Sequence, residues 1–108
     1  MAELHPIDAL FATIVTRKRA GVKKSYTAQL LKRGVAQCAK KLGEEGVEAA
    51  LAAVSGKKKD IVAESADVLY HLLVVWAATG VKPKSVYDTL DARRAQSGLV
   101  EKKSRKRK

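Results

Sequence analysis

Acidic side chains with regular spacing are the first feature of this 108-residue chain that could do chemistry. Glu45 and Glu48 are three residues apart, and so are Glu64 and Asp67. On a helix, residues three apart lie on the same face, so each pair projects two carboxylates in one direction. The neighbouring apolar residues place both pairs at the edge of a buried helical stripe rather than opposite it. Glu44 adds a fifth carboxylate beside the first pair.

The two acidic pairs would meet if their helices packed antiparallel through these apolar stripes. Four carboxylates at such short range repel one another strongly unless a cation neutralises them. Oxygen ligands favour a hard ion such as Mg²⁺ or Mn²⁺ over Zn²⁺, and substrate phosphates commonly complete the shell of protein-bound Mg²⁺. The pattern therefore indicates a divalent-metal site that acts on a phosphorylated substrate. Two other interpretations stay open, namely ordinary exposed helix charges and a metal site without catalysis.

Cationic residues near these acids are candidates for binding an anionic substrate. Lys41 lies one turn before Glu45 on the same helical arc, where it could contact phosphate or simply pair with Glu45. A basic segment also precedes Ser25, and its side chains could contact phosphates or form an ordinary solvated charge run. These further candidates are Arg17, Lys18, Arg19, Lys23 and Lys24.

Two other chemically versatile side chains lie on predicted helices. His71 follows Asp67 by one turn on the same face, so it could hydrogen-bond a ligand carboxylate or be a satisfied core histidine. Cys38 is the only cysteine of the chain and lies on an apolar stripe, where we expect it to fill the core. A single cysteine excludes an internal disulfide framework and a cysteine-based zinc site.

Helical periodicity dominates the chain and predicts an all-α fold of four helices. Pro6 is suited to open the first helix, and Ser25 to cap the second. Inside the second helical region, Gly34 is a candidate kink, while Gly43 and Gly46 are expected to let another backbone or a ligand approach closely. The expected helices cover residues 7–17, about 26–53, 60–79 and 84–94.

Composition and charge limit the class of protein. With 46% hydrophobic residues, the chain can form one small domain, assigned to 1–100, and the basic tail 101–108 is expected to be disordered. No uninterrupted apolar run approaches the roughly 18 residues of a membrane span, and no signal peptide is recognised, so we expect a cytoplasmic protein. The third helix is apolar nearly all round over 68–78, which predicts a bundle completed by homodimerisation. A compact monomer is the alternative.

The acidic signature, with fifteen residues between its halves, resembles the E-E-x-x-E…E-x-x-D signature of the all-α, MazG-type nucleotide pyrophosphohydrolases. Flanking segments narrow the resemblance to the phosphoribosyl-ATP pyrophosphohydrolase family, and it covers roughly residues 7–105. The chain departs from the family in a short, lysine-rich loop before Ser25 and in an unusually basic C-terminus. The flanking segments are SYT (25–27), KLGEEGVE (41–48), ESADVLYHLL (64–73) and Arg94-x-x-Ser97-Gly98.

The resemblance implies hydrolysis of 1-(5-phosphoribosyl)-ATP between its α- and β-phosphates, the second step of histidine biosynthesis. It implies phosphoribosyl-AMP and pyrophosphate as products, and Mg²⁺, with Mn²⁺ as an alternative, as the cofactor. Glu44 and Glu45 are the expected catalytic residues, and Glu44, which lies beside the ligand arc, could align or deprotonate the attacking water. The implied metal ligands are Glu45, Glu48, Glu64 and Asp67.

Two rival functions stay open from the sequence. A house-cleaning pyrophosphohydrolase acting on a free nucleotide such as dUTP or dCTP would use the same acidic signature, although the SYT and DVLYHLL segments argue against it. A basic helical nucleic-acid-binding protein would fit the net charge of +11. That rival leaves the clustered carboxylates unexplained, so we expect a small nucleotide as the partner rather than a nucleic acid or a membrane.

Overall fold

A computed structural model of the chain describes residues 4–21 and 25–96, and within these ranges it contains helices and no strand. The expected all-α class is therefore confirmed. Lys23, Lys24 and the basic tail 101–108 lie outside the described residues. In chain order the helices are α1 (Pro6–Arg17), α2 (Tyr26–Lys32), α3 (Val35–Ser55), α4 (Lys58–Thr79) and α5 (Pro83–Arg94).

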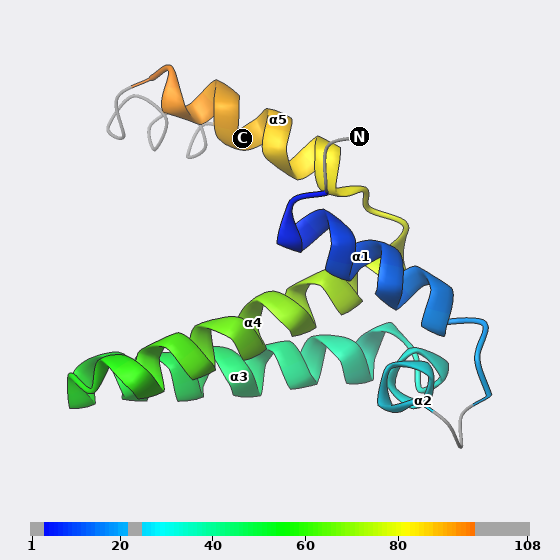
Figure 1. The fold of residues 1–108 in the computed structure, drawn as a ribbon, viewed down its shortest axis with the longest axis horizontal. Coiled ribbons are helices and arrows are strands. Elements are labelled where there is room, and N and C mark those ends of the chain that lie inside the picture. The colour runs from blue at the N-terminus through cyan, green and yellow to red at the C-terminus, as the bar shows by residue number, and fades with distance from the viewer. Residues whose placement is uncertain (1–3, 22–24, 97–108) are drawn as a thin grey trace.

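A long antiparallel hairpin of α3 and α4 forms the base of the molecule (Figure 1). Gly56 ends α3 with a left-handed φ of 76°, and its N–H bonds the carbonyls of Ala52 and Ala53. The chain then reverses within two residues, so that α4 returns along α3. Gly80 ends α4 in the same way, with φ 79°, as expected from its position before Pro83. This hairpin brings the two acidic segments into one region.

The second predicted helical region is in fact two helices, so the expectation of four helices is wrong for the described part of the chain. α2 ends at Lys32 and α3 begins at Val35, and in Figure 1 the two point in different directions. Gly34 between them has φ 95° and ψ 173°, a combination essentially restricted to glycine. Apolar residues continue at helical spacing on both sides of Gly34, so periodicity alone does not reveal the break.

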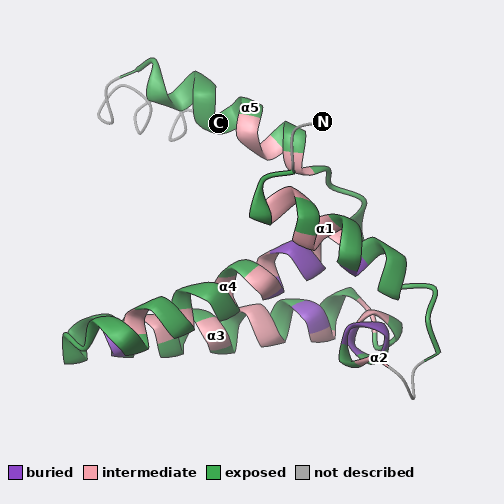
Figure 2. Cartoon of the chain, viewed as in Figure 1, coloured by how far each residue is buried: buried purple, intermediate pink, exposed green. Residues whose placement is uncertain are grey.

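The hydrophobic core lies at one end of the hairpin, where α1 and α2 cover the adjoining parts of α3 and α4 (Figure 2). Cys38 is fully buried there, and its Sγ lies 3.4 Å from the Leu30 carbonyl oxygen, which confirms its expected place in the core. The opposite end of the hairpin is largely exposed in the single chain. The buried members of the core cluster are Ile14, Leu30, Cys38, Leu73, Val74 and Trp76.

α4 has an apolar composition that needs an explanation. By length and composition alone it is long and apolar enough to cross a membrane, a feature that the search for uninterrupted apolar runs did not reveal. The central helix of a folded domain meets the same criterion. α4 packs against α1 and α3 and buries Leu73, Val74 and Trp76, so these apolar residues serve the core, while Val62 and Leu69 are exposed. This feature is therefore weak evidence for a membrane segment.

The two helical glycines of α3 do not have the predicted close neighbour. A methyl group built at Gly43 or Gly46 meets no described atom within 4 Å, leaving aside the backbone of the helix itself. Within the described part of the single chain no other backbone approaches these positions, so that half of the expectation is wrong, while the approach of a ligand stays a prediction.

Gly34→Ala should lower the free energy of unfolding by about 1–3 kcal/mol, because alanine is strained at this backbone conformation. No atom of the described residues lies within 4 Å of the new methyl group, so the expected effect comes from the backbone conformation. Gly43→Ala, in the interior of α3, should instead raise the free energy of unfolding by roughly 0.5–1 kcal/mol. Urea unfolding followed by circular dichroism measures both free energies. An unchanged or raised stability of Gly34→Ala would contradict the left-handed backbone conformation at Gly34.

Candidate metal centre

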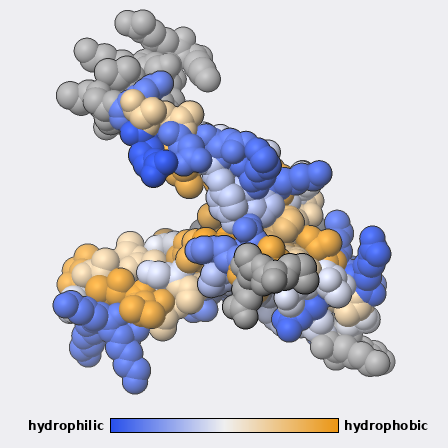
Figure 3. All heavy atoms as spheres, turned by 45° about the horizontal axis from the view of Figure 1, so that its top comes forward, coloured by the Kyte–Doolittle hydropathy of each residue, from blue (hydrophilic) through white to orange (hydrophobic). Residues whose placement is uncertain are grey.

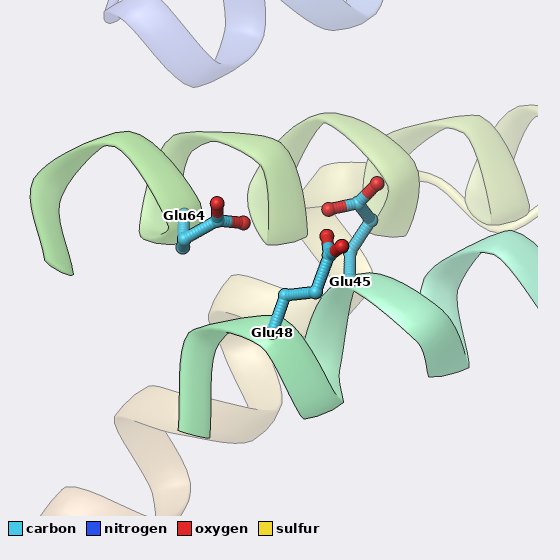
Figure 4. Close-up of side chains that lie close together, drawn as sticks. All are labelled: Glu45, Glu48 and Glu64. Carbon is cyan, nitrogen blue, oxygen red and sulfur yellow. The ribbon is translucent and has the colours of Figure 1, made fainter. Parts of the chain in front are cut away.

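Three of the predicted acids meet where α3 packs against α4. Glu45 and Glu48 project from α3 and Glu64 projects from α4, and the three side chains reach into the space between the helices (Figure 4). One ligand oxygen from each lies within 4.8 Å of those of the other two. Oxygens at this spacing can all contact one cation. We call Glu45, Glu48 and Glu64 the acid trio.

The acid trio is electrostatically strained in the absence of a cation. The pKa of Glu45 is raised, first by a hydrogen bond with Glu48, then by loss of solvent and by the Glu48 charge. The pKa of Glu64 is raised mainly by desolvation and further by the charge of Glu48. One oxygen of Glu45 and one of Glu64 are shielded from solvent and have no hydrogen-bond partner among the described residues. Shielded carboxylate oxygens of this kind need a compensating positive charge.

Asp67 and His71 continue the same face of α4 beyond Glu64. Asp67 is exposed and lies outside the acid trio, but its charge contributes to the raised pKa of both Glu45 and Glu64. His71 is only 6% exposed, and its Nδ1 lies 2.9 Å from the backbone carbonyl oxygen of Asp67. The imidazole therefore bonds the main chain of a predicted ligand rather than its carboxylate. Its Nε2 is buried without a partner among the described residues.

Two tyrosines hold the His71 ring, and the sequence reasoning gave neither of them a role. The Tyr70 ring meets His71 edge-on with centroids 4.9 Å apart, and the exposed Tyr26 does so at 6.4 Å. The Tyr70 hydroxyl forms a hydrogen bond with the Thr27 hydroxyl, which ties α4 to α2. Both tyrosines belong to segments that carry the family resemblance, and that resemblance could have indicated their place at the site.

Lys41 and Glu44 pair with each other at the edge of the site. The Lys41 Nζ lies 3.3 Å from Glu44 Oε1, and this hydrogen bond is the main reason that the pKa of Lys41 is raised. The predicted alternative for Lys41 was a pair with Glu45, one residue further along the helix. Glu44 thus turns toward Lys41 and stands outside the acid trio.

In the described part of the chain, no ion pair joins the predicted basic segment to the acid trio. Arg17, Lys18 and Arg19 are exposed at the end of α1. Lys18 and Lys32 line a cavity of about 450 Å³ between this end of α1 and α2, and no member of the acid trio lines it.

Glu64→Gln should stabilise the metal-free chain more at neutral pH than at about pH 4.5. A carboxyl whose pKa is raised by folding binds more protons in the folded chain than in the unfolded chain. Its contribution to stability therefore falls as the pH rises from the unfolded pKa through the folded one. Glutamine stays neutral at every pH, so the variant does not lose this stability as the pH rises.

Thermal unfolding in EDTA, followed by circular dichroism, measures this difference at the two pH values. Asp88→Asn is the control, because Asp88 is exposed and bonds Lys84 far from the trio; it should give no such gain. A Glu64→Gln effect that is equal at both pH values would show that the trio imposes no electrostatic penalty.

Comparison with known proteins agrees with the family resemblance of the sequence. Residues 7–94 match the family model described as phosphoribosyl-ATP pyrophosphohydrolase. The chain is 51% identical over 104 residues to the phosphoribosyl-ATP pyrophosphatase of Parvibaculum lavamentivorans, covering 96% of this chain and 95% of the relative. It is 52% identical over 99 residues to that of Roseobacter denitrificans, covering 92% and 94%. The chain therefore belongs to the phosphoribosyl-ATP pyrophosphohydrolase family.

Proposed function

We propose that this chain hydrolyses 1-(5-phosphoribosyl)-ATP to 1-(5-phosphoribosyl)-AMP and pyrophosphate, as the second step of histidine biosynthesis. The family match over residues 7–94 supports the substrate and the reaction. The observation that carries the chemistry is the convergence of three carboxylates from α3 and α4. A triphosphate is itself anionic, so such a cluster fits a triphosphate substrate only with a cation between them.

The residues of the acid trio fit a divalent cation. They supply oxygen donors alone, which favour Mg²⁺ or Mn²⁺, and two of those oxygens are shielded from solvent without a partner. Glu45, Glu48 and Glu64 would hold the ion, with Asp67 beside them on α4. When bound, a divalent ion neutralises phosphate charge and lowers the pKa of water.

The other charged residues of the site have separate tasks in this proposal. Lys41 stands at the edge of the acid trio and offers a cation to the phosphates, while Glu44 fixes its position through their ion pair. Glu44 is also near enough in sequence to the trio to orient a water. Lys18 and its neighbours at the end of α1 are exposed and free to meet a more distant phosphate of the substrate.

A second copy of the chain completes the molecule in this proposal. Val47, Leu51 and Val54 lie on one stripe of α3 at helical spacing, and all three are exposed, with Val54 at 87%. Val62 and Leu69 form a matching exposed stripe on α4. Figure 3 shows the apolar atoms on the surface of the hairpin. Exposed apolar stripes of this kind are typical of association sites, and a homodimer would bury them.

The cellular context follows from the same proposal. A small-molecule nucleotide is the partner, rather than a nucleic acid or a membrane, and the reaction belongs in the cytoplasm. The acid trio would repel a nucleic-acid backbone in the absence of a metal ion.

Glu45→Gln should lower turnover of phosphoribosyl-ATP by about a hundredfold or more, because it removes one charged group that the reaction needs. Release of pyrophosphate is the readout, and the helical circular dichroism should be unchanged. Asp88→Asn, the same carboxylate-to-amide change on exposed α5, should leave turnover unaffected. Near-normal activity of Glu45→Gln would remove this residue from the site.

EDTA should abolish pyrophosphate release from phosphoribosyl-ATP, and excess Mg²⁺ or Mn²⁺ should restore it. A panel with dUTP and dCTP in place of phosphoribosyl-ATP tests the substrate, and the proposal expects much slower release from both. Faster hydrolysis of a free nucleotide would assign the chain to house-cleaning instead. Full activity in EDTA would contradict a metal-dependent reaction.

Leu51→Arg should convert a dimer into a monomer, because it places a charge in the exposed apolar stripe of α3. Sedimentation velocity measures the mass at micromolar concentration. Ala12→Arg, an apolar-to-charged change on the exposed face of α1, should leave the dimer intact. A wild-type chain that sediments as a monomer would defeat the proposed association.

A further inference from the structure

The Nε2 atom of His71 is the one buried nitrogen of a side chain that has no hydrogen-bond partner among the described residues. Only 6% of His71 is exposed, so bulk solvent does not provide a hydrogen-bond partner for Nε2. Buried polar atoms without partners are rare and point to a missing water, ion or ligand. Among the described residues, the other two buried side-chain atoms without a partner are oxygens of Glu45 and Glu64.

The tautomer of His71 follows from its bond to the main chain. A carbonyl oxygen only accepts, so Nδ1, which lies 2.9 Å from the Asp67 carbonyl oxygen, carries the proton. The Nε2 atom of a neutral imidazole then presents a lone pair and needs a donor. An ionised carboxylate has no proton to give, so in their ionised form the acids around it do not serve as that donor. The missing partner is therefore a donor or a cation.

The position of His71 restricts the choice further. His71 lies two turns after Glu64 on the same face of α4, and it is near enough to Glu45 across the helix contact to affect the pKa of that carboxyl. His71 nevertheless does not belong to the group of ligand atoms that lie within 4.8 Å of one another. An ion held by the acid trio is thus out of direct reach of the imidazole, and a water between the two would bridge them.

We propose that His71 Nε2 accepts a hydrogen bond from a water in the hydration shell of the divalent ion at the acid trio. His71 is then a positioning residue, which fixes that water and strengthens ion binding. The inference rests on the proposed metal site and adds to it a residue that touches neither the ion nor the phosphates. A single hydrated ion would satisfy all three unpartnered atoms of Glu45, Glu64 and His71.

Two substitutions distinguish the role of Nδ1 of His71 from that of Nε2. Asparagine can keep the bond to the Asp67 carbonyl, because its amide nitrogen lies near the Nδ1 position, but it has nothing at Nε2. Glutamine is one carbon longer and places an acceptor oxygen near Nε2. His5→Asn is the matched control, since His5 is exposed and caps α1, a role that asparagine also fills.

Titration of the full chain with Mn²⁺ alone, with free Mn²⁺ followed by electron paramagnetic resonance, is the test. His71→Asn should weaken Mn²⁺ binding by about tenfold or more, His71→Gln should weaken it less, and His5→Asn should leave it unchanged. Wild-type affinity in His71→Asn would overturn the inference while leaving the metal site standing. A wild-type chain that binds no Mn²⁺ would overturn the metal site and this inference together.

A second measurement does not depend on how the His71 variants fold. Pulsed electron-nuclear double resonance on Mn²⁺-loaded His5→Asn chain, made with ¹⁵N-histidine, detects His71 alone. A weak coupling, typical of a nitrogen one water away from the ion, is expected. A strong coupling would show direct ligation, and the absence of any coupling would show that His71 is remote; either result would overturn the inference.

Discussion

Mutual repulsion of carboxylates at the contact between α3 and α4 is the constraint on which this molecule depends. Glu45 and Glu48 come from one helix and Glu64 from the other, and packing of the hairpin holds their oxygens within 4.8 Å. The pKa of Glu45 is raised first by its hydrogen bond with Glu48 and that of Glu64 mainly by desolvation, and the neighbouring negative charges raise both further. Clustered carboxylates with raised pKa values are typical of functional sites. The proposed divalent cation and phosphate substrate would explain why the fold keeps these acids together.

The rest of the fold serves to hold this contact in place. Gly56 lets α4 return directly along α3, and the core at the far end of the hairpin fixes the two helices against α1 and α2. Tyr70 links α4 to α2 through Thr27 and packs on His71, so the core and the acidic site share one layer of side chains. The exposed apolar stripes on the same hairpin explain why a second copy would stabilise it.

Local spacing predicted the most about the site, because the helical period decides which side chains share a face. It placed Glu45 and Glu48 together without knowledge of the fold. The break at Gly34 escaped this reasoning, since the backbone changes direction there while the apolar register continues. The pairing of Lys41 with Glu44, rather than Glu45, depends on side-chain rotamers that spacing does not determine. Where the basic end of α1 lies depends on tertiary packing, about which periodicity says nothing.

Anomalous X-ray diffraction from crystals grown with Mn²⁺ tests the central claim most directly, because it locates the ion without any assay. Our account predicts an anomalous peak between the carboxylates of Glu45, Glu48 and Glu64. A map that places Mn²⁺ only elsewhere on the chain, or that shows these three side chains turned apart into solvent, would contradict it.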